Sequence, residues 1–235
     1  MGVKAVLFDL DGTLLPMDQD VFVKDYFGRL ARYLAPHGFE PKQLIDTIWL
    51  GTAAMMKNDG EMTNEDRFWQ SFATVYGADV REKEPLFDAY YREIFDLVRD
   101  SCGYDPKAAE TVATLKAAGY RVILATSPIF PAIATEKRIA WAGLAPSDFE
   151  LVTTYENARY TKPHLDYYRE ILAATGLTPE ECIMVGNDAT EDMIAAELGM
   201  KVFLMPRDLI NRKGVDISVY PQGGFDELLR YVGLI

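Results

Sequence analysis

The order of apolar and polar positions divides the chain into three stretches. The first is the short run Val3–Leu10, which is apolar except for Lys4 and Asp9 and is typical of a strand buried on both faces. From residue 18 to residue 103 the apolar positions recur at helical spacing, and no strand pattern stands out. From residue 104 onward, short β-prone runs alternate with helical segments.

Start and stop signals divide residues 18–103 into four predicted helices. Gly38 and Pro41 separate the first two, Thr63 is placed to cap the third, and Pro85 opens the fourth. Gly51 interrupts the apolar pattern of the second helix, which indicates a break near the segment 49–56. Residues 18–103 therefore form a compact helical insert after the first strand.

The third stretch predicts a regular alternation of helix and strand. We expect strands over 121–126, 149–154, 181–185, 201–205 and 217–220, and helices over 106–118, 131–142, 163–175, 190–198 and 225–232. Strands joined by helices of this length imply right-handed crossovers and a parallel sheet with helices on both faces. The predicted fold is α/β, a doubly wound Rossmann-like parallel sheet core formed by residues 1–17 and 104–235, with a four-helix domain inserted at 18–103.

Charge and composition narrow the class of protein. With 36 acidic against 24 basic residues the net charge is −12, which argues against nucleic acid and anionic membranes as partners. No apolar run reaches the roughly 18 residues of a membrane span, and no signal peptide is evident, so we expect a cytoplasmic protein. Cys102 and Cys182 are expected to be free buried thiols. Nothing in the sequence fixes the oligomeric state, and a monomer is the starting expectation.

Polar residues gather where the predicted strands end, the edge at which open parallel sheets bind ligands. They are Asp9, Asp11, Gly12 and Thr13, then Thr126 and Ser127, then Thr161 and Lys162, then Asn187 and Asp188, with Asp192 one helical turn further on. Several carboxylates in one crevice raise each other's pKa unless a cation joins them. Mg²⁺ prefers carboxylates, carbonyls, water and a substrate phosphate, and the lysine and hydroxyls would complete a phosphate cradle.

The run Asp9-Leu10-Asp11-Gly12-Thr13 resembles the signature of the haloacid dehalogenase superfamily of hydrolases. Thr126 at a strand end, Lys162 before a proline, and Asn187-Asp188 with Asp192 match its later motifs in the same order. The resemblance extends over nearly the whole chain, since residues 18–103 resemble the helical cap of the C1-type phosphatase branch. It implies a Mg²⁺-dependent phosphomonoesterase that acts on a small phosphorylated metabolite.

The resemblance also implies a role for each motif residue. Asp9 would be the nucleophile that forms an aspartyl-phosphate, and Asp11 would be the general acid and base. Mg²⁺ would be bound by the Asp9 carboxylate, the Asp11 backbone carbonyl and Asp188, with Asp192 acting behind them through a water or a neighbouring ligand. Thr126, Ser127, Lys162 and the backbone beside Gly12 would bind the phosphate. Asn187 departs from the superfamily pattern, in which an acid is common at this position.

Other readings of the same residues stay open at this level. A sugar-phosphate mutase of the same superfamily would share every core residue and differ only in the cap. A phospho-acceptor signalling module also uses acids and a lysine on a parallel sheet, although it has no lid over its aspartate. A phosphonate-cleaving relative would need a cap lysine, for which Lys57 is the nearest candidate, and Asp11 disfavours a dehalogenase. Asp192 could simply be an acid at a helix N-terminus.

Overall fold

Four parallel strands form the sheet of the computed structural model, which describes residues 2–235. Their order is β2 (Arg121–Leu124), β1 (Ala5–Phe8), β3 (Cys182–Gly186) and β4 (Lys201–Leu204), so the first strand is central. Leu7 of β1 pairs with Ile123 on one side and with Met184 on the other. All residues of β1 and β3 are buried, which explains why these strands are apolar without alternation.

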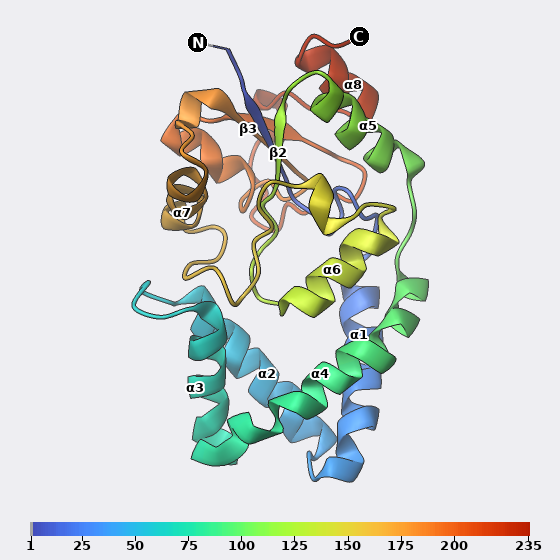
Figure 1. Cartoon of the computed structure of the whole chain (residues 1–235), viewed down its shortest axis with the longest axis vertical. Helices are drawn as coiled ribbons and strands as arrows, with labels where there is room; N and C mark the ends of the chain where they lie inside the picture. The colour runs from blue at the N-terminus through green and yellow to red at the C-terminus, as the bar shows by residue number, and fades with distance from the viewer. Residues whose placement is uncertain (1) are drawn as a thin grey trace.

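Helices cover both faces of the sheet (Figure 1). Val6 and Phe8 pack in the same apolar cluster as residues of α5 (Pro106–Ala117), α6 (Ala132–Trp141) and α8 (Phe225–Tyr231). Ala5 and Leu7 point the other way, into a second cluster with α7 (Leu165–Thr175). The doubly wound parallel arrangement predicted from the sequence is confirmed.

The helices of residues 18–103 lie together at the opposite end of the molecule from the two termini (Figure 1). They are α1 (Gln19–Leu34), α2 (Pro41–Met56), α3 (Asn64–Tyr76) and α4 (Glu84–Glu93), joined by 3-10 turns at Ala35–His37 and Ala78–Lys83 and followed by one at Phe95–Ser101. The Thr63 hydroxyl accepts a hydrogen bond from the Asp66 backbone at 3.1 Å, as its capping position predicts.

The predicted break at Gly51 is wrong, because α2 runs unbroken from Pro41 to Met56. Gly51 is buried, and a Cβ atom there would lie 2.5 Å from Cδ2 of Phe68 on α3. The glycine therefore permits close packing of two helices and does not end one of them.

Three predicted elements in the third stretch also differ. Residues 149–154 run beside β2, where the Glu150 amide bonds to the Val122 carbonyl at 2.8 Å, but only Val152 forms a regular bridge, so this is no full strand. The expected strand 217–220 is a 3-10 turn at Ile217–Val219, and the helix expected over 190–198 is a 3-10 helix at Met193–Leu198. Further 3-10 turns span Pro146–Asp148 and Pro179–Glu181.

The remaining features of the chain are its two cysteines and the lengths of its helices. Cys182 is buried and Cys102 half-buried, and both are free thiols. Within residues 2–235, every helix is too short or too polar to cross a bilayer.

Candidate active site

A cavity of about 430 Å³ opens at the carboxyl ends of the strands, where the sheet faces the helical insert. We call it the strand-end pocket. Its core-side walls include Asp9, Asp11, Thr126, Ser127, Lys162, Asn187, Asp188, Glu191, Asp192 and Arg212, and its insert-side walls include Asp20, Val23, Trp49, Thr52 and Met56. Four loops that lie far apart in the sequence therefore meet at one place. Most of the predicted strand-end residues line the pocket, and the exceptions are Gly12, Thr13 and Thr161.

Lys162 is the centre of a buried ion network. Its ammonium lies 2.8 Å from Oδ1 of Asp9 and 2.7 Å from Oδ1 of Asp192, and its side chain is only 1% exposed. Burial opposes the charged form of Lys162, but the two carboxylates outweigh it and hold the pKa of the lysine well above its ordinary value. The lysine is therefore a fixed positive charge beside the end of β1.

The turn after β1 fixes the second oxygen of Asp9. The Thr13 hydroxyl lies 3.3 Å from Oδ2 of Asp9 and 3.1 Å from Oδ1 of Asn187. Gly12 has φ +83°, and a Cβ atom there would lie 2.2 Å from Nδ2 of Asn187, so only glycine fits. The Asn187 amide also donates to the Asp208 carbonyl at 2.6 Å, which makes Asn187 a buried link between the two loops.

Asp188 and Asp192 shape the loop after β3. Oδ1 of Asp188 accepts hydrogen bonds from the backbone amides of Thr190 at 2.7 Å and Glu191 at 2.8 Å. Oδ2 of Asp192 accepts from the Asp188 amide at 2.9 Å, while its other oxygen binds Lys162. Asp192 thus fixes the position of both the lysine and the loop that carries Asp188.

Arg138 is a site residue that the sequence reasoning missed. This arginine of α6 is fully buried and forms an ion pair with Oδ2 of Asp11, while its guanidinium lies 4.3 Å from the centre of the Phe130 ring. Burial raises the pKa of Asp11 above its ordinary range, and Arg138 counteracts part of that rise. A signal was present, since Arg138 shares a helix face with the apolar Ala134 and Trp141, four residues before and three after it.

Thr126 lies two residues beyond the end of β2. Its carbonyl accepts hydrogen bonds from the hydroxyls of Thr153 at 2.7 Å and Tyr167 at 2.9 Å, which fixes the backbone from which Thr126 and Ser127 face the pocket. Hydroxyl groups in this position suit the oxygens of a phosphate.

Negative charge dominates the strand-end pocket. Six carboxylates line it, from Asp9, Asp11, Asp20, Asp188, Glu191 and Asp192, against the two cations Lys162 and Arg212. Burial, opposed by Lys162, raises the pKa of Glu191 to about 7 and that of Asp192 to about 6, and nearby carboxylates add to both shifts. An anionic ligand would therefore need a further cation.

The donors at the strand ends suit Mg²⁺. Within residues 2–235, no three acidic, histidine or cysteine side chains are close enough to form a cage for a metal. Mg²⁺ needs no such cage, because it takes one or two carboxylates and completes its shell with carbonyls, water and substrate. Oδ2 of Asp188 makes no hydrogen bond within the described residues, so it is free to act as one such ligand.

Comparison with known proteins identifies related chains over nearly the full length. A family model described as haloacid dehalogenase-like hydrolase matches residues 3–199. A glyceraldehyde 3-phosphate phosphatase from Methanothermobacter thermautotrophicus is 28% identical over 92% of this chain and 95% of its own. The pyrophosphatase PpaX of Bacillus velezensis is 25% identical, covering 85% and 81% of the two chains. The HAD-hydrolase YfnB of Bacillus subtilis, solved bound to magnesium, has a TM-score of 0.57 at 18% identity, covering 99% of this chain and 100% of its own.

Proposed function

The chain belongs to the haloacid dehalogenase-like hydrolase family, and we propose that it is a Mg²⁺-dependent phosphomonoesterase that hydrolyses a small phosphorylated metabolite through an aspartyl-phosphate on Asp9. Related chains with phosphatase and pyrophosphatase names support a phosphatase activity. The observation that carries the proposal is the meeting of Asp9, Asp11, Thr126, Lys162 and Asp188 around one pocket.

Asp9 has the environment that a carboxylate nucleophile needs. Lys162 and Thr13 each bind one of its oxygens, so the carboxylate has a defined orientation at the edge of the pocket. In the first step an oxygen of Asp9 attacks phosphorus in line, the bond from phosphorus to the ester oxygen breaks, and the proton of Asp11 goes to that oxygen. In the second step Asp11 takes a proton from water, the water oxygen attacks phosphorus, and phosphate leaves with the Asp9 carboxylate restored.

The phosphate would be bound by a positively charged side chain and by hydrogen-bond donors. Lys162, Thr126 and Ser127 line the pocket and would supply an ammonium and two hydroxyls, and the tight turn at Gly12 would present backbone amides. Asp192 would act through Lys162 and the Asp188 loop, because one of its oxygens binds the ammonium and the other accepts from the Asp188 amide. These contacts are strongest when negative charge builds up on the phosphoryl oxygens, which lowers the barrier to transfer.

The ligands of Mg²⁺ would be the Asp9 carboxylate, the Asp11 backbone carbonyl and Asp188. When bound, the ion would offset the excess of carboxylates and reduce the repulsion between an anionic nucleophile and an anionic phosphate. The magnesium-bound family member of similar fold supports this choice of metal.

The two parts of the chain would have different roles in the reaction. Residues 1–17 and 104–235 would be the catalytic core, and residues 18–103 the cap that covers the strand-end pocket. The cap residues Val23, Trp49, Thr52 and Met56 already line that pocket, so they would contact the leaving group. A closed cap would exclude water during the first step.

Phosphate release from p-nitrophenyl phosphate with Mg²⁺ tests the function. We expect Asp9→Asn to remove turnover, because an amide cannot attack phosphorus. Asp11→Asn should be slow, yet it should still take phosphate from this substrate, whose leaving group needs no proton. Mass spectrometry of the quenched Asp11→Asn protein should then find phosphate on Asp9.

The matched control for these variants is Asp46→Asn, whose carboxylate on the exposed side of α2 pairs only with Lys42. This change should leave turnover unaltered. Phosphate on a serine, threonine or histidine, or full turnover in Asp9→Asn, would contradict the proposal. A signalling module would take up phosphate without sustained release, and a mutase would convert a sugar phosphate to its isomer.

A further inference from the structure

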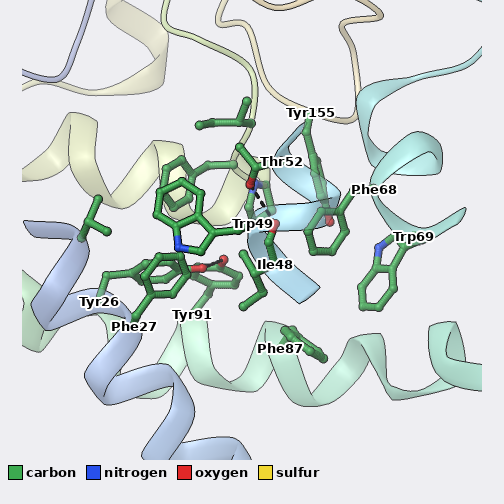
Figure 2. A pocket seen from close by; sticks show the side chains of 14 residues that line it. Tyr26, Phe27, Ile48, Trp49, Thr52, Phe68, Trp69, Phe87, Tyr91 and Tyr155 are labelled. Atoms are coloured by element: carbon green, nitrogen blue, oxygen red, sulfur yellow. Dashed lines mark hydrogen bonds between the residues drawn. The ribbon is translucent and has the colours of Figure 1, made fainter. Parts of the chain in front are cut away.

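A second cavity, of about 100 Å³, lies where the helical insert meets the loops after β2 (Figure 2). We call it the aromatic cavity. Helices α1 to α4 all contribute to it, together with residues 129–131 and Tyr155, and its walls include Tyr26, Phe27, Trp49, Phe68, Trp69 and Phe130. A cavity lined by aromatic rings in this way is suited to an apolar or aromatic group.

The walls are mostly apolar, and three of their hydroxyl groups already have hydrogen-bond partners. No lining residue is charged. The hydroxyls of Tyr26 and Tyr91 bond to each other at 2.7 Å, and the Thr52 hydroxyl donates to the Ile48 carbonyl at 3.0 Å. A ligand rich in hydroxyl groups would therefore lose its hydrogen bonds to water here and gain few in return.

The Trp69 indole N–H is a buried donor in the walls, close to the Tyr155 hydroxyl. The indole N–H of Trp69 is buried, makes no hydrogen bond within residues 2–235, and belongs to a side chain that lines the cavity. Figure 2 shows the indole nitrogen on the edge of the ring that faces Phe68. Since buried donors are normally paired, this N–H and the Tyr155 hydroxyl beside it together mark a position for a hydrogen-bond acceptor of a ligand.

The aromatic cavity adjoins the strand-end pocket. Five residues line both spaces: Val23, Trp49, Thr52, Ile129 and Phe130. Trp49 is 49% exposed, so its ring stands at the boundary between the two and is not locked in the interior. A group attached to a phosphate at Asp9 would reach the aromatic cavity past this ring.

We propose that the aromatic cavity receives the leaving group, and that the substrate is a phosphomonoester of an apolar, ring-sized alcohol that carries one hydrogen-bond acceptor. This inference rests on the proposed phosphatase function and specifies its substrate class. The volume agrees with a single ring, because an apolar cavity of ~150 Å³ in another protein binds benzene. The acceptor would bind the Trp69 N–H.

Three phosphate esters of primary alcohols test the substrate class. Benzyl phosphate would place a ring in the cavity, ethyl phosphate has no ring to place there, and glycerol 3-phosphate would bring hydroxyls into it. We expect kcat/KM for benzyl phosphate to exceed the other two by about tenfold or more, the discrimination typical of an apolar pocket. Equal values for the three esters would overturn the inference.

Two variants test whether the leaving group binds in the aromatic cavity. Ile48→Phe places a larger ring among the lining residues and should lower the ratio of kcat/KM for benzyl over ethyl phosphate by about tenfold. Leu50→Phe is the matched control, because Leu50 lies two residues further along α2, is 48% exposed and is absent from the lining. It should leave that ratio unchanged. An unchanged ratio in Ile48→Phe would also overturn the inference.

Trp69→Phe tests the acceptor and keeps the wall apolar. In the wild type, the better of the 3- and 4-methoxy derivatives of benzyl phosphate should have a higher kcat/KM than benzyl phosphate itself. This advantage should disappear in Trp69→Phe, and its persistence would contradict the role of the indole N–H. If Ile48→Phe does not fold, the Trp69→Phe comparison still tests whether the leaving group binds in the aromatic cavity.

These outcomes separate the two proposals. If neither p-nitrophenyl phosphate nor any alkyl ester releases phosphate with Mg²⁺, the phosphatase function itself fails, and the substrate class with it. If all esters are hydrolysed but benzyl phosphate has no advantage, the function stands and the substrate class fails.

Discussion

Asp11 and Arg138 are joined by an ion pair although 127 positions separate them in the sequence. The Arg138 side chain is fully buried, while that of Asp11 is 19% exposed at the pocket. Arg138 binds Oδ2 of Asp11, while Oδ1 is buried and makes no hydrogen bond within residues 2–235. Arg138 is thus a positioning residue for the proposed general acid.

The pH dependence of turnover tests this role. Arg138→Gln removes the charge that lowers the pKa of Asp11, so that pKa, already raised by burial, should rise further. Because Asp11 must be protonated to donate to the leaving oxygen, the basic limb of kcat/KM for an alkyl phosphate should move to higher pH.

Arg138→Lys is the control for that experiment, since it keeps a positive charge near Asp11. It should return the basic limb toward the wild-type position. If Arg138→Gln lowers activity but leaves both limbs in place, Arg138 only supports the fold.

Gly12 offers a second test at the level of one residue. Gly12→Ala would place Cβ 2.2 Å from the Asn187 amide and would displace the loop that orients Asp9 and Thr13. We expect turnover to fall at least about tenfold, which corresponds to roughly 1.4 kcal/mol of barrier. Phosphate release from p-nitrophenyl phosphate measures the effect.

The matched control is Gly119→Ala, because Gly119 has a similar φ of +87° but open space around it. Both variants should lose about 1–2 kcal/mol of unfolding free energy from the left-handed backbone, and Gly12→Ala should lose more because of its contact with Asn187. Only Gly12→Ala should lose turnover. An equal loss of turnover in both variants would show that reduced stability alone is responsible.

Among the elements, α2 and α3 pack so closely that a glycine is needed between them. Gly51 lies inside α2, where glycine normally costs about 1 kcal/mol relative to alanine. The Phe68 ring occupies the space that a side chain would need, and the same ring lines the aromatic cavity. The shape of that cavity therefore depends on how these two helices approach each other.

A pair of glycine variants separates packing from helix propensity. Gly28→Ala in α1 meets only the end of Arg32 at 3.9 Å, so it should raise the free energy of unfolding by about 0.5–1 kcal/mol. Gly51→Ala gains the same propensity but overpacks against Phe68, and should lower it by about 1–3 kcal/mol. Urea denaturation measures both, and stabilisation by Gly51→Ala would show that Phe68 moves freely.

At the scale of the whole molecule, negative charge is the dominant constraint. The chain carries a net charge of −12, and its pocket has six carboxylates against two cations. An anionic substrate would meet repulsion both at a distance and on contact. The proposed divalent cation resolves this conflict at the point where phosphate and Asp9 must approach each other.

Removal of metal is the corresponding experiment. Turnover of p-nitrophenyl phosphate should vanish in EDTA, return with Mg²⁺, and be inhibited by Ca²⁺, which takes more ligands at longer distances than an in-line geometry allows. NaCl at equal ionic strength is the control for screening. Full turnover after exhaustive dialysis against EDTA would contradict the metal requirement.

The catalytic candidates could be found in the sequence because they depend on local pattern. Asp9, Lys162 and Asp188 each follow an apolar run or precede a helix signal, and the parallel topology brings such positions to one edge of the sheet. The strand predicted over 149–154 is wrong, because only Val152 forms a bridge to β2. A β-prone run does not show how many of its residues will pair with a neighbouring strand.

The sequence by itself determined the α/β class, the helical insert and the polar strand ends, since these follow from periodicity, capping signals and the order of motifs. Only the tertiary structure decided that Arg138 meets Asp11, that Asn187 fills the space beside Gly12, and that aromatic rings of the insert enclose a cavity. Each of these is a contact between segments far apart in the chain. Their geometry depends on how helices and loops pack in three dimensions, which no local pattern specifies.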